Sequence, residues 1–345
     1  MKKLNRVLSL SAAAALALSL TACSGGTSGT ADTPAANASA STGGSGGTYT
    51  VAVIKQMDHA SLDEIADAIA ARLDEIAAEN GITIQYEVTS GQGDQTVLRQ
   101  LADQAIADGV DAIIPIATTA AQVAAVSAEE SQTPVVFAAI SYPETADLTG
   151  IDYVTGTSDA LDTNLILDMM LAQNPELQSV GLLYSLSEPN SEVPIADAKA
   201  YLDEKGIAYT EATANTNDEV IAAASSLIAD GVDAVFTPTD NIIMAAELAI
   251  YEDFINAGIP HYTGADSFVR NGAFATCGVN YTDLGAQTAD LAYQAMTEGM
   301  DSLEDYYQVA GGLITVNSET AEALGIDTSV FDSMGEVAAV TTTEE

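Results

Sequence analysis

One seven-residue segment occurs twice in this chain. The sequence Ile-Ala-Asp-Gly-Val-Asp-Ala at residues 106–112 recurs letter for letter at residues 228–234. Each copy has the composition of a helix end, a turn and the start of a buried strand. Each leads into a Thr-rich strand exit, at residues 116–119 and 237–240. One α/β lobe rarely needs the same unit twice, so the repeat favours two similar lobes that face each other across a ligand cleft.

The apolar pattern of the first half alternates between strands and helices. Strands are expected at residues 49–54, 82–88, 112–116 and 134–140, and helices at residues 62–79, 96–107 and 120–130. In the first helix Ile65, Ile69 and Leu73 recur at helical spacing, and Asn80-Gly81 ends it. This alternating order predicts a parallel sheet with helices on both faces.

The second half repeats the order. Strands are expected at residues 180–184, 208–213, 234–237 and 260–264, and helices at residues 194–205, 219–229 and 241–257. A further strand at 274–280, a helix at 284–296 and a last strand at 309–316 follow. The predicted fold class is therefore α/β, with two similar Rossmann-like lobes built on parallel sheets.

The N-terminus has the features of a bacterial lipoprotein signal. Lys2, Lys3 and Arg6 precede an apolar stretch at residues 7–20 that is too short to span a bilayer well. Leu20-Thr21-Ala22-Cys23 then has the form of a lipobox. We expect residues 1–22 to be the signal peptide, Cys23 to be lipidated, and residues 23–48 to be a flexible linker rich in Gly, Ser, Thr and Ala. The alternative is an ordinary signal peptide with a chance Cys.

The charge balance excludes one large class of partner. The chain carries 50 acidic and 9 basic residues, a net charge of −41, and signal cleavage would remove three of the cations. Nucleic-acid binding needs cations that neutralise phosphates, so it is excluded. With Cys23 lipidated, Cys277 has no partner for a disulfide, and we interpret it as a buried thiol. No cofactor and no metal site are expected.

At this point the motifs resemble those of a known family. His59-Ala60-Ser61-Leu62-Asp63, Glu188-Pro189-Asn190-Ser191 and Pro238-Thr239-Asp240-Asn241 are similar to segments of the substrate-binding lipoproteins of bacterial ABC importers, of the tryptophan/tyrosine type. So are residues 117–122, Tyr184, Gly278, Tyr281 and Gly285. The resemblance covers nearly all of residues 49–324. It implies a periplasmic-binding-protein type I fold whose two lobes, joined by three crossovers, close on an amino acid.

The resemblance also implies lobe boundaries. The crossovers are expected near Tyr142, Gly272 and Met300. The N-terminal lobe would comprise residues 49–141 plus 272–299, and the C-terminal lobe residues 142–271 plus 300–331. Residues 332–345 are expected to be a disordered acidic tail. Thr119 and Tyr142 depart from the family pattern, which commonly has Pro and Asp there, and this affects the identity of the ligand more than the fold.

Ligands of parallel α/β sheets bind at the carboxyl ends of the strands. With the resemblance, that rule gives sixteen candidate contacts: Gln56, His59, Thr118, Thr119, Ala120, Gln122, Ser141, Tyr142, Tyr184, Glu188, Asn190, Ser191, Asp240, Asn241, Asp266 and Tyr281. Cations are scarce at these exits, which favours a zwitterion over an anion.

Three parts of a zwitterion find complementary groups in this set. Hydroxyls and helix N-termini at Thr118, Thr119, Ala120 and Ser191 suit its carboxylate. Asp240, Asp266 and Glu188 suit its ammonium, and Tyr142, Tyr184 and Tyr281 suit an aromatic side chain. The bland alternatives are a helix cap for Asp240, a helix-entry role for His59, and turn formation for Asn190 and Ser191.

The function expected is the extracytoplasmic receptor of an ABC importer, held at the outer face of the bacterial membrane. It would act as a monomer, close on a small ligand such as tryptophan, tyrosine or phenylalanine, and deliver it to a permease. The alternatives are a receptor for a nucleoside, a sugar or a branched-chain amino acid, and a sensor subunit. A two-lobed hydrolase is a further class, whose minimum would be convergent carboxylates such as Asp240 and Asp266.

Overall fold

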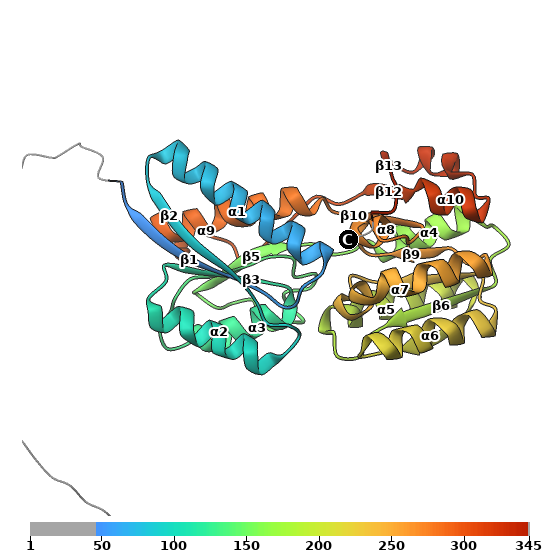
Figure 1. The fold of residues 1–345 in the computed structure, drawn as a ribbon, viewed down its shortest axis with the longest axis horizontal. Coiled ribbons are helices and arrows are strands. Elements are labelled where there is room, and N and C mark those ends of the chain that lie inside the picture. The colour runs from blue at the N-terminus through green and yellow to red at the C-terminus, as the bar shows by residue number, and fades with distance from the viewer. Residues whose placement is uncertain (1–45, 344–345) are drawn as a thin grey trace, which may run out of the picture. The chain divides into compact units, whose positions relative to one another are not determined.

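The structure is a computed structural model that describes residues 46–343. The expected signal peptide, Cys23 and nearly all of the expected linker lie outside the described residues. The described part forms two α/β lobes (Figure 1). The predicted fold class of two parallel-sheet lobes flanked by helices is confirmed.

The first lobe is built on a sheet that has six strands within residues 46–343, in the order β11-β5-β4-β3-β1-β2. Its strands are β1 (Thr48–Lys55), β2 (Thr83–Ser90), β3 (Ala112–Ile116), β4 (Val135–Phe137), β5 (Val154–Ser158) and β11 (Tyr307–Gln308), and all neighbours are parallel. Its helices are α1 (Ala60–Asn80), α2 (Gln95–Asp108), α3 (Thr118–Ala128) and α9 (Tyr281–Glu298). Figure 1 shows α1 and α9 on one face of the sheet and α2 and α3 on the other.

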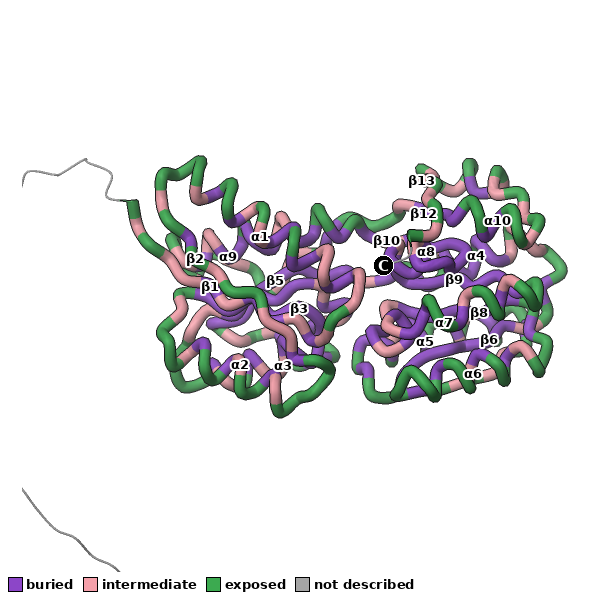
Figure 2. Tube along the Cα trace, in the orientation of Figure 1, coloured by how far each residue is buried: buried purple, intermediate pink, exposed green. Residues whose placement is uncertain are grey.

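The second lobe has a seven-stranded sheet within the same described range, in the order β13-β12-β10-β9-β8-β6-β7. Its strands are β6 (Ser179–Tyr184), β7 (Ala208–Thr213), β8 (Ala234–Thr237), β9 (His261–Thr263), β10 (Ala275–Gly278), β12 (Leu313–Asn317) and β13 (Val337–Val340). Only the β10–β12 pair is antiparallel. Its helices are α4 (Thr163–Gln173), α5 (Glu192–Lys205), α6 (Asn217–Asp230), α7 (Asn241–Ala257), α8 (Asp266–Arg270) and α10 (Ser318–Leu324). The strands are buried and the outer helix faces are exposed (Figure 2).

Short 3-10 turns complete the described chain: η1 (Pro189–Ser191), η2 (Met300–Ser302) and η3 (Thr328–Ser333).

The repeated segment performs the same structural task in both lobes. Each copy ends a helix at an αL glycine, Gly109 with φ 73° and Gly231 with φ 69°, a conformation that glycine adopts without a Cβ penalty. The Asp that follows then ties the new strand to its neighbour. Asp111 Oδ2 accepts a hydrogen bond from the Thr50 amide at 2.7 Å, and Asp233 Oδ2 accepts from the Ser179 amide at 2.9 Å. The identity of the two copies reflects this shared helix-to-strand connection.

The lobe boundaries lie later in the chain than expected, which corrects the predicted crossovers near Tyr142, Gly272 and Met300. β5 pairs with β4 and so belongs to the first sheet, and β10 pairs with β9 in the second. β11 pairs with β5, so the chain returns to the second lobe only after Gln308. The crossovers therefore follow β5, β10 and β11.

The reason for this shift is the composition of β5. Its sequence, Val-Thr-Gly-Thr-Ser, is too polar to give a strand signal, yet all five residues are buried. Two buried threonine hydroxyls have hydrogen-bond partners, because Thr155 donates to the Glu304 carbonyl at 2.7 Å and Thr157 pairs with the Thr288 hydroxyl at 2.7 Å. The tertiary fold thus satisfies a polar strand that periodicity could not identify.

The C-terminal segment is ordered, so the prediction of a disordered tail at residues 332–345 is wrong over the described positions up to 343. β13 pairs in parallel with β12 at the edge of the second sheet. Beyond it, the Thr342 hydroxyl accepts a hydrogen bond from Asn317 Nδ2 at 2.9 Å, and the Thr343 amide donates to the Arg270 carbonyl at 2.8 Å. The four small apolar residues Val-Ala-Ala-Val are enough to form a strand here because β12 offers a free edge to pair with.

Cys277 lies in β10 with its side chain buried, as expected for a structural thiol. Burial, with the nearby charge of Asp162, raises the pKa of the Cys277 thiol to about 11. The thiol therefore stays protonated and unreactive near neutral pH.

Candidate functional site

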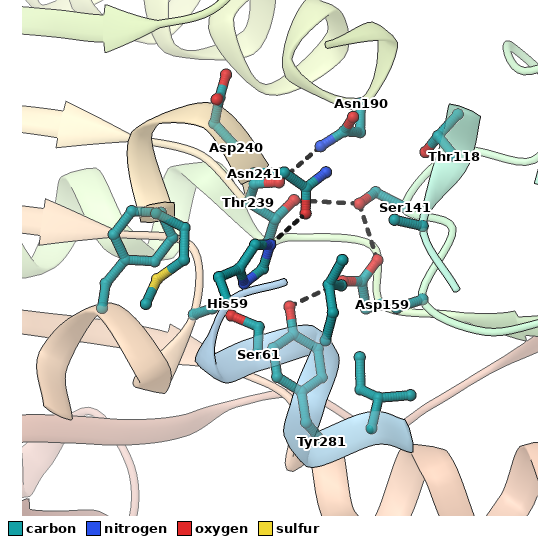
Figure 3. A pocket seen from close by; sticks show the side chains of 17 residues that line it. His59, Ser61, Thr118, Ser141, Asp159, Asn190, Thr239, Asp240, Asn241 and Tyr281 are labelled. Atoms are coloured by element: carbon teal, nitrogen blue, oxygen red, sulfur yellow. Dashed lines mark hydrogen bonds between the residues drawn. The ribbon is translucent and has the colours of Figure 1, made fainter. Parts of the chain in front are cut away.

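A cavity lies between the two lobes and is lined by side chains from both (Figure 3). His59, Ser61, Thr118, Ser141, Asp159 and Tyr281 come from the first lobe, and Asn190, Thr239, Asp240 and Asn241 from the second. Leu62, Ile65, Met244 and Phe268 add apolar walls. The free space measures about 20 Å³, which is room for about one water molecule. Any larger ligand therefore requires the lobes or the lining side chains to move apart.

Two backbone positions in the lining are strained. Ala117 has φ 76° and Ala139 has φ 57°, although non-glycine residues rarely adopt positive φ. Both follow strands of the first sheet, β3 and β4, and both line the cavity. Such conformations persist only where the surrounding structure imposes them, and they concentrate at binding sites.

Among residues 46–343, two carboxylates line this cavity, Asp159 and Asp240, and Asp159 accepts fewer hydrogen bonds from other residues. It follows β5 and is buried, with only 4% of its surface exposed. It accepts hydrogen bonds from the Ser141 hydroxyl at 2.8 Å and the Tyr281 hydroxyl at 3.0 Å. Burial raises the pKa of Asp159, because neither hydroxyl compensates for the loss of water around its charge. An ammonium group placed here would supply the missing counter-charge.

Sequence reasoning missed Asp159 because it missed the strand that carries it. The predicted site residues of the first sheet follow β1, β3 and β4, whereas β5 has no apolar pattern. The only available signal was the position of Asp159 directly after a Thr-Gly-Thr-Ser run.

Asp240, by contrast, is fully occupied by its own lobe. Its Oδ1 accepts from the amides of Ile242 at 3.0 Å and Ile243 at 3.1 Å, which caps α7. Its Oδ2 accepts from the Ser185 amide and the Ser191 hydroxyl, each at 2.7 Å. The capping alternative therefore accounts for Asp240, although one side of the residue still lines the cavity.

Glu188 bridges the lobes instead of lining the cavity. Its Oε1 accepts from Gln56 Nε2 at 2.8 Å and its Oε2 from Asn241 Nδ2 at 2.5 Å. Gln56 is in turn oriented by the Thr119 amide, which donates to Gln56 Oε1 at 3.0 Å. Burial, followed by the neighbouring charge of Asp240, raises the pKa of Glu188 to about 8. The carboxyl group therefore exchanges its proton near physiological pH.

His59 begins α1 and also crosses between the lobes. Its Nε2 lies 3.0 Å from Asn241 Oδ1. Burial lowers the pKa of His59 to about 4, so the imidazole is neutral at pH 7. Within residues 46–343, its second ring nitrogen, Nδ1, is buried without a hydrogen-bond partner.

Three further contacts join the lobes. Ser61 and Ser267 share a short hydroxyl–hydroxyl hydrogen bond, and the Ser141 hydroxyl pairs with Thr239 Oγ1 at 3.2 Å. Arg270 of α8 forms ion pairs with Asp266 beside it and with Glu64 of α1 across the interface. These contacts hold the lobes together, and Figure 3 shows the one between Ser141 and Thr239.

The structure brings together some of the predicted site residues and separates others. His59, Thr118, Ser141, Asn190, Asp240, Asn241 and Tyr281 line the cavity. Gln56, Thr119, Glu188 and Ser191 support it through the hydrogen bonds described above. Ala120, Gln122, Tyr142, Tyr184 and Asp266 do not line it.

Each of the last group is used elsewhere in its own lobe. Gln122 Nε2 donates to the Ala146 carbonyl at 3.0 Å, and the Tyr184 hydroxyl donates to Glu211 at 2.6 Å. Asp266 pairs with Arg270, and the buried Ala120 packs in the core beside α2. The Tyr142 hydroxyl lies 3.5 Å from the Leu161 carbonyl. Of the three tyrosines expected to stack on a ligand, only Tyr281 lines the cavity, and its side chain is buried.

Comparison with known proteins decides the family. The family described as ABC transporter substrate binding protein matches residues 50–335. This chain belongs to that family. Its members are extracytoplasmic receptors of ABC transporters, and no helix among residues 46–343 is long and apolar enough to cross a membrane.

Individual relatives are similar over most of this substrate-binding protein. A tyrosine-binding protein of Clostridioides difficile (strain R20291) is 27% identical over 251 residues, which is 71% of this chain and 72% of the relative. A domain from Streptococcus pneumonia solved with L-Trp is 27% identical, with a TM-score of 0.76 over 84% of this chain and all of the other. A ligand-free, open substrate binding protein from Clostridium difficile is 25% identical, with a TM-score of 0.64 over 86% of this chain and all of the other.

Proposed function

We propose that this substrate-binding protein captures an aromatic L-amino acid and delivers it to an ABC permease. The observation that carries the proposal is the buried carboxylate of Asp159 in the inter-lobe cavity, which two neutral hydroxyls and its own backbone N–H stabilise. An amino acid's ammonium group matches it. The relatives named for tyrosine and solved with L-Trp support the same ligand class.

The remaining walls suit the rest of such a ligand. Thr118 begins α3, where free backbone N–H groups and the helix dipole favour a carboxylate. Leu62, Ile65, Met244 and Phe268 provide an apolar wall for a side chain. The lobes then act as a hinged pair, since the present free space admits only about one water. The higher TM-score against the L-Trp complex than against the open relative agrees with lobes drawn together here.

The test uses the absence of tryptophan from this chain. We expect residues 24–345 to bind free L-tryptophan, seen as a saturable rise in the anisotropy of ligand emission excited where tyrosine is silent. L-Tyrosine and L-phenylalanine should compete, and D-tryptophan serves as the matched control. A flat titration would contradict the proposed ligand, and a thermal-shift screen with nucleosides, sugars and branched-chain amino acids would then identify the class. Ligand at about 100 times its Kd should stabilise the fold by roughly 2.7 kcal/mol.

We also propose that Cys23 is lipidated and that the linker holds the receptor near its permease. The proposal rests on the lipobox-like segment at residues 20–23 and the Gly/Ser-rich stretch that follows. In a bacterial host, wild-type protein should incorporate labelled palmitate and fractionate with membranes. Cys23→Ser should lose both properties while Cys277→Ser keeps them. Equal labelling of the two variants would refute the anchor.

A further inference from the structure

The inference concerns His59 and rests on the proposed function. His59 lines the cavity (Figure 3), and the apolar side chains of Leu62, Met244 and Phe268 are part of the same lining. Its Nδ1 is buried, and among residues 46–343 it has no hydrogen-bond partner. A buried polar atom without a hydrogen-bond partner destabilises the fold, so we expect a ligand to supply a complementary group.

The hydrogen-bond network determines what that group must be. The Thr119 amide fixes Gln56, so Gln56 Nε2 must donate to Glu188 Oε1. Asn241 Nδ2 donates to Glu188 Oε2, which leaves Asn241 Oδ1 as an acceptor. His59 Nε2 must then carry the proton that Asn241 Oδ1 accepts. Because the imidazole is neutral, Nδ1 keeps a lone pair and can only accept a hydrogen bond.

We propose that His59 Nδ1 accepts a hydrogen bond from an N–H or O–H on the ligand's side chain, and that the proton on Glu188 controls whether it can. The receptor would thereby select side chains that carry a donor, such as an indole or a phenol, over a plain aromatic ring of similar size. Met244 and Phe268 would recognise the ring, and His59 its polar atom.

The control by Glu188 follows from the same chain of contacts. A protonated Glu188 carries an O–H that needs an acceptor, and Asn241 supplies one if its amide turns over. Asn241 Nδ2 then donates to His59 Nε2, so the imidazole proton moves to Nδ1 and the cavity-facing atom becomes a donor. No proton is gained or lost beyond the one that Glu188 takes from solvent. Ionised Glu188 thus sets His59 as an acceptor, and neutral Glu188 sets it as a donor.

On the α7 side Glu188 faces Asp240, and burial raises the pKa of both carboxyl groups. Asp240 accepts four hydrogen bonds and Glu188 accepts two, so we assign the proton of the pair to Glu188. Around His59 stand Lys55, Asp58 and Asp63, and Lys55 forms ion pairs with both of those carboxylates. With its pKa raised to about 8, Glu188 loses its proton as the pH rises through that value. The preference for donor-bearing ligands should therefore increase with pH.

The experiment compares L-tryptophan with L-3-benzothienylalanine, in which sulfur replaces the indole N–H without adding bulk. Affinities come from direct titration of tryptophan and from competition. At pH 9 the wild-type receptor should prefer tryptophan by about tenfold or more, as expected for a buried hydrogen bond. At pH 6.5 the preference should fall to a few-fold or less. The L-tyrosine and L-phenylalanine pair should behave in the same way.

Matched variants separate the two nitrogens of the ring. In His59→Asn an amide atom replaces Nδ1, and in His59→Gln an amide atom replaces Nε2 while Nδ1 is lost. We expect His59→Asn to retain part of the preference and His59→Gln to lose it. Glu188→Gln imitates the protonated carboxyl, so it should hold the low preference at every pH.

Each outcome bears on one proposal. If no aromatic amino acid binds, the proposed function fails. If tryptophan and its sulfur analogue bind equally to the wild-type receptor at pH 9, a water molecule satisfies Nδ1 and the inference about His59 is overturned. If the preference exists but does not change with pH or in Glu188→Gln, the control by Glu188 is overturned.

Discussion

Replacing Asp159 with Asn is expected to weaken binding of an aromatic amino acid by at least about 30-fold. Truncating one partner of a buried, hydrogen-bonded charge pair costs about 2–5 kcal/mol, because the other charge is left unpaired. Asn keeps the shape of the side chain and can still pair with the Ser141 and Tyr281 hydroxyls. Isothermal titration calorimetry at pH 7 measures the loss.

The same substitution should leave the unliganded protein as stable as the wild type, or more so. Because the folded-state pKa of Asp159 lies above its unfolded value, its ionisation disfavours the folded state. The penalty is absent below the unfolded pKa, grows as pH rises towards the folded pKa, and is constant above it. Asn removes the penalty. Urea denaturation without ligand, at two pH values, tests this sign.

Asp240→Asn is the matched control, since it makes the same chemical change in the same cavity. Asn can still cap α7 through Oδ1, but its Nδ2 would face the Ser185 amide, and leaving that buried donor without an acceptor costs roughly 1–3 kcal/mol of folding stability. We therefore expect Asp240→Asn to reduce stability more than affinity, the reverse of Asp159→Asn. If Asp159→Asn binds like the wild type, the ammonium site lies elsewhere.

Replacing Phe331 with Ala is expected to lower the free energy of unfolding by about 3–5 kcal/mol, the usual cost of removing a buried phenylalanine ring. Phe331 is 0% exposed, and its ring centroid lies 6.2 Å from that of Phe274, the residue before β10. It lies in η3, immediately before the segment that leads into β13, so it attaches the C-terminal strand to the second lobe. Guanidinium denaturation monitored by circular dichroism measures the change.

Leu186→Ala is the control for this truncation, because Leu186 is a large apolar residue that is 72% exposed. Its removal should change the stability by no more than about 0.5 kcal/mol. A loss below about 1 kcal/mol in Phe331→Ala would show that Phe331 does not attach the C-terminal segment to the folded lobe.

Local patterns were sufficient for much of the fold. Ile65, Ile69 and Leu73 repeat at helical spacing and are fully buried on α1. The αL glycines Gly109 and Gly231 end α2 and α6 at the residue where the turn was expected. Such features depend on residues close in sequence, so a single chain reveals them.

Local patterns could not predict the elements that depend on contacts between distant segments. β5 is polar, and its threonines are satisfied by Glu304 and Thr288, far along the chain. β13 forms only because β12 presents a free edge. Missing β5 misplaced the first crossover and left Asp159 out of the predicted site. Missing β13 misplaced the end of the second lobe.

The candidate site divides in the same way. The sequence located the strand exits, and seven of the predicted residues do line the cavity. The sequence could not show that both carboxylate oxygens of Asp240 accept hydrogen bonds from its own lobe. Nor could it show that Asp159 accepts fewer and can still bind a ligand. Both are Asp residues after a strand, and only the donors that surround each of them distinguish the two.

The sequence by itself determined the α/β class, the two similar lobes and the family, because a repeated helix-to-strand unit and short motifs are properties of neighbouring residues. Only the tertiary structure decided which carboxylate is available to a ligand, where the crossovers lie and how Gln56, Glu188, Asn241 and His59 connect the lobes. Those properties depend on burial and on hydrogen bonds between residues 53 to 182 positions apart, and no local pattern encodes them.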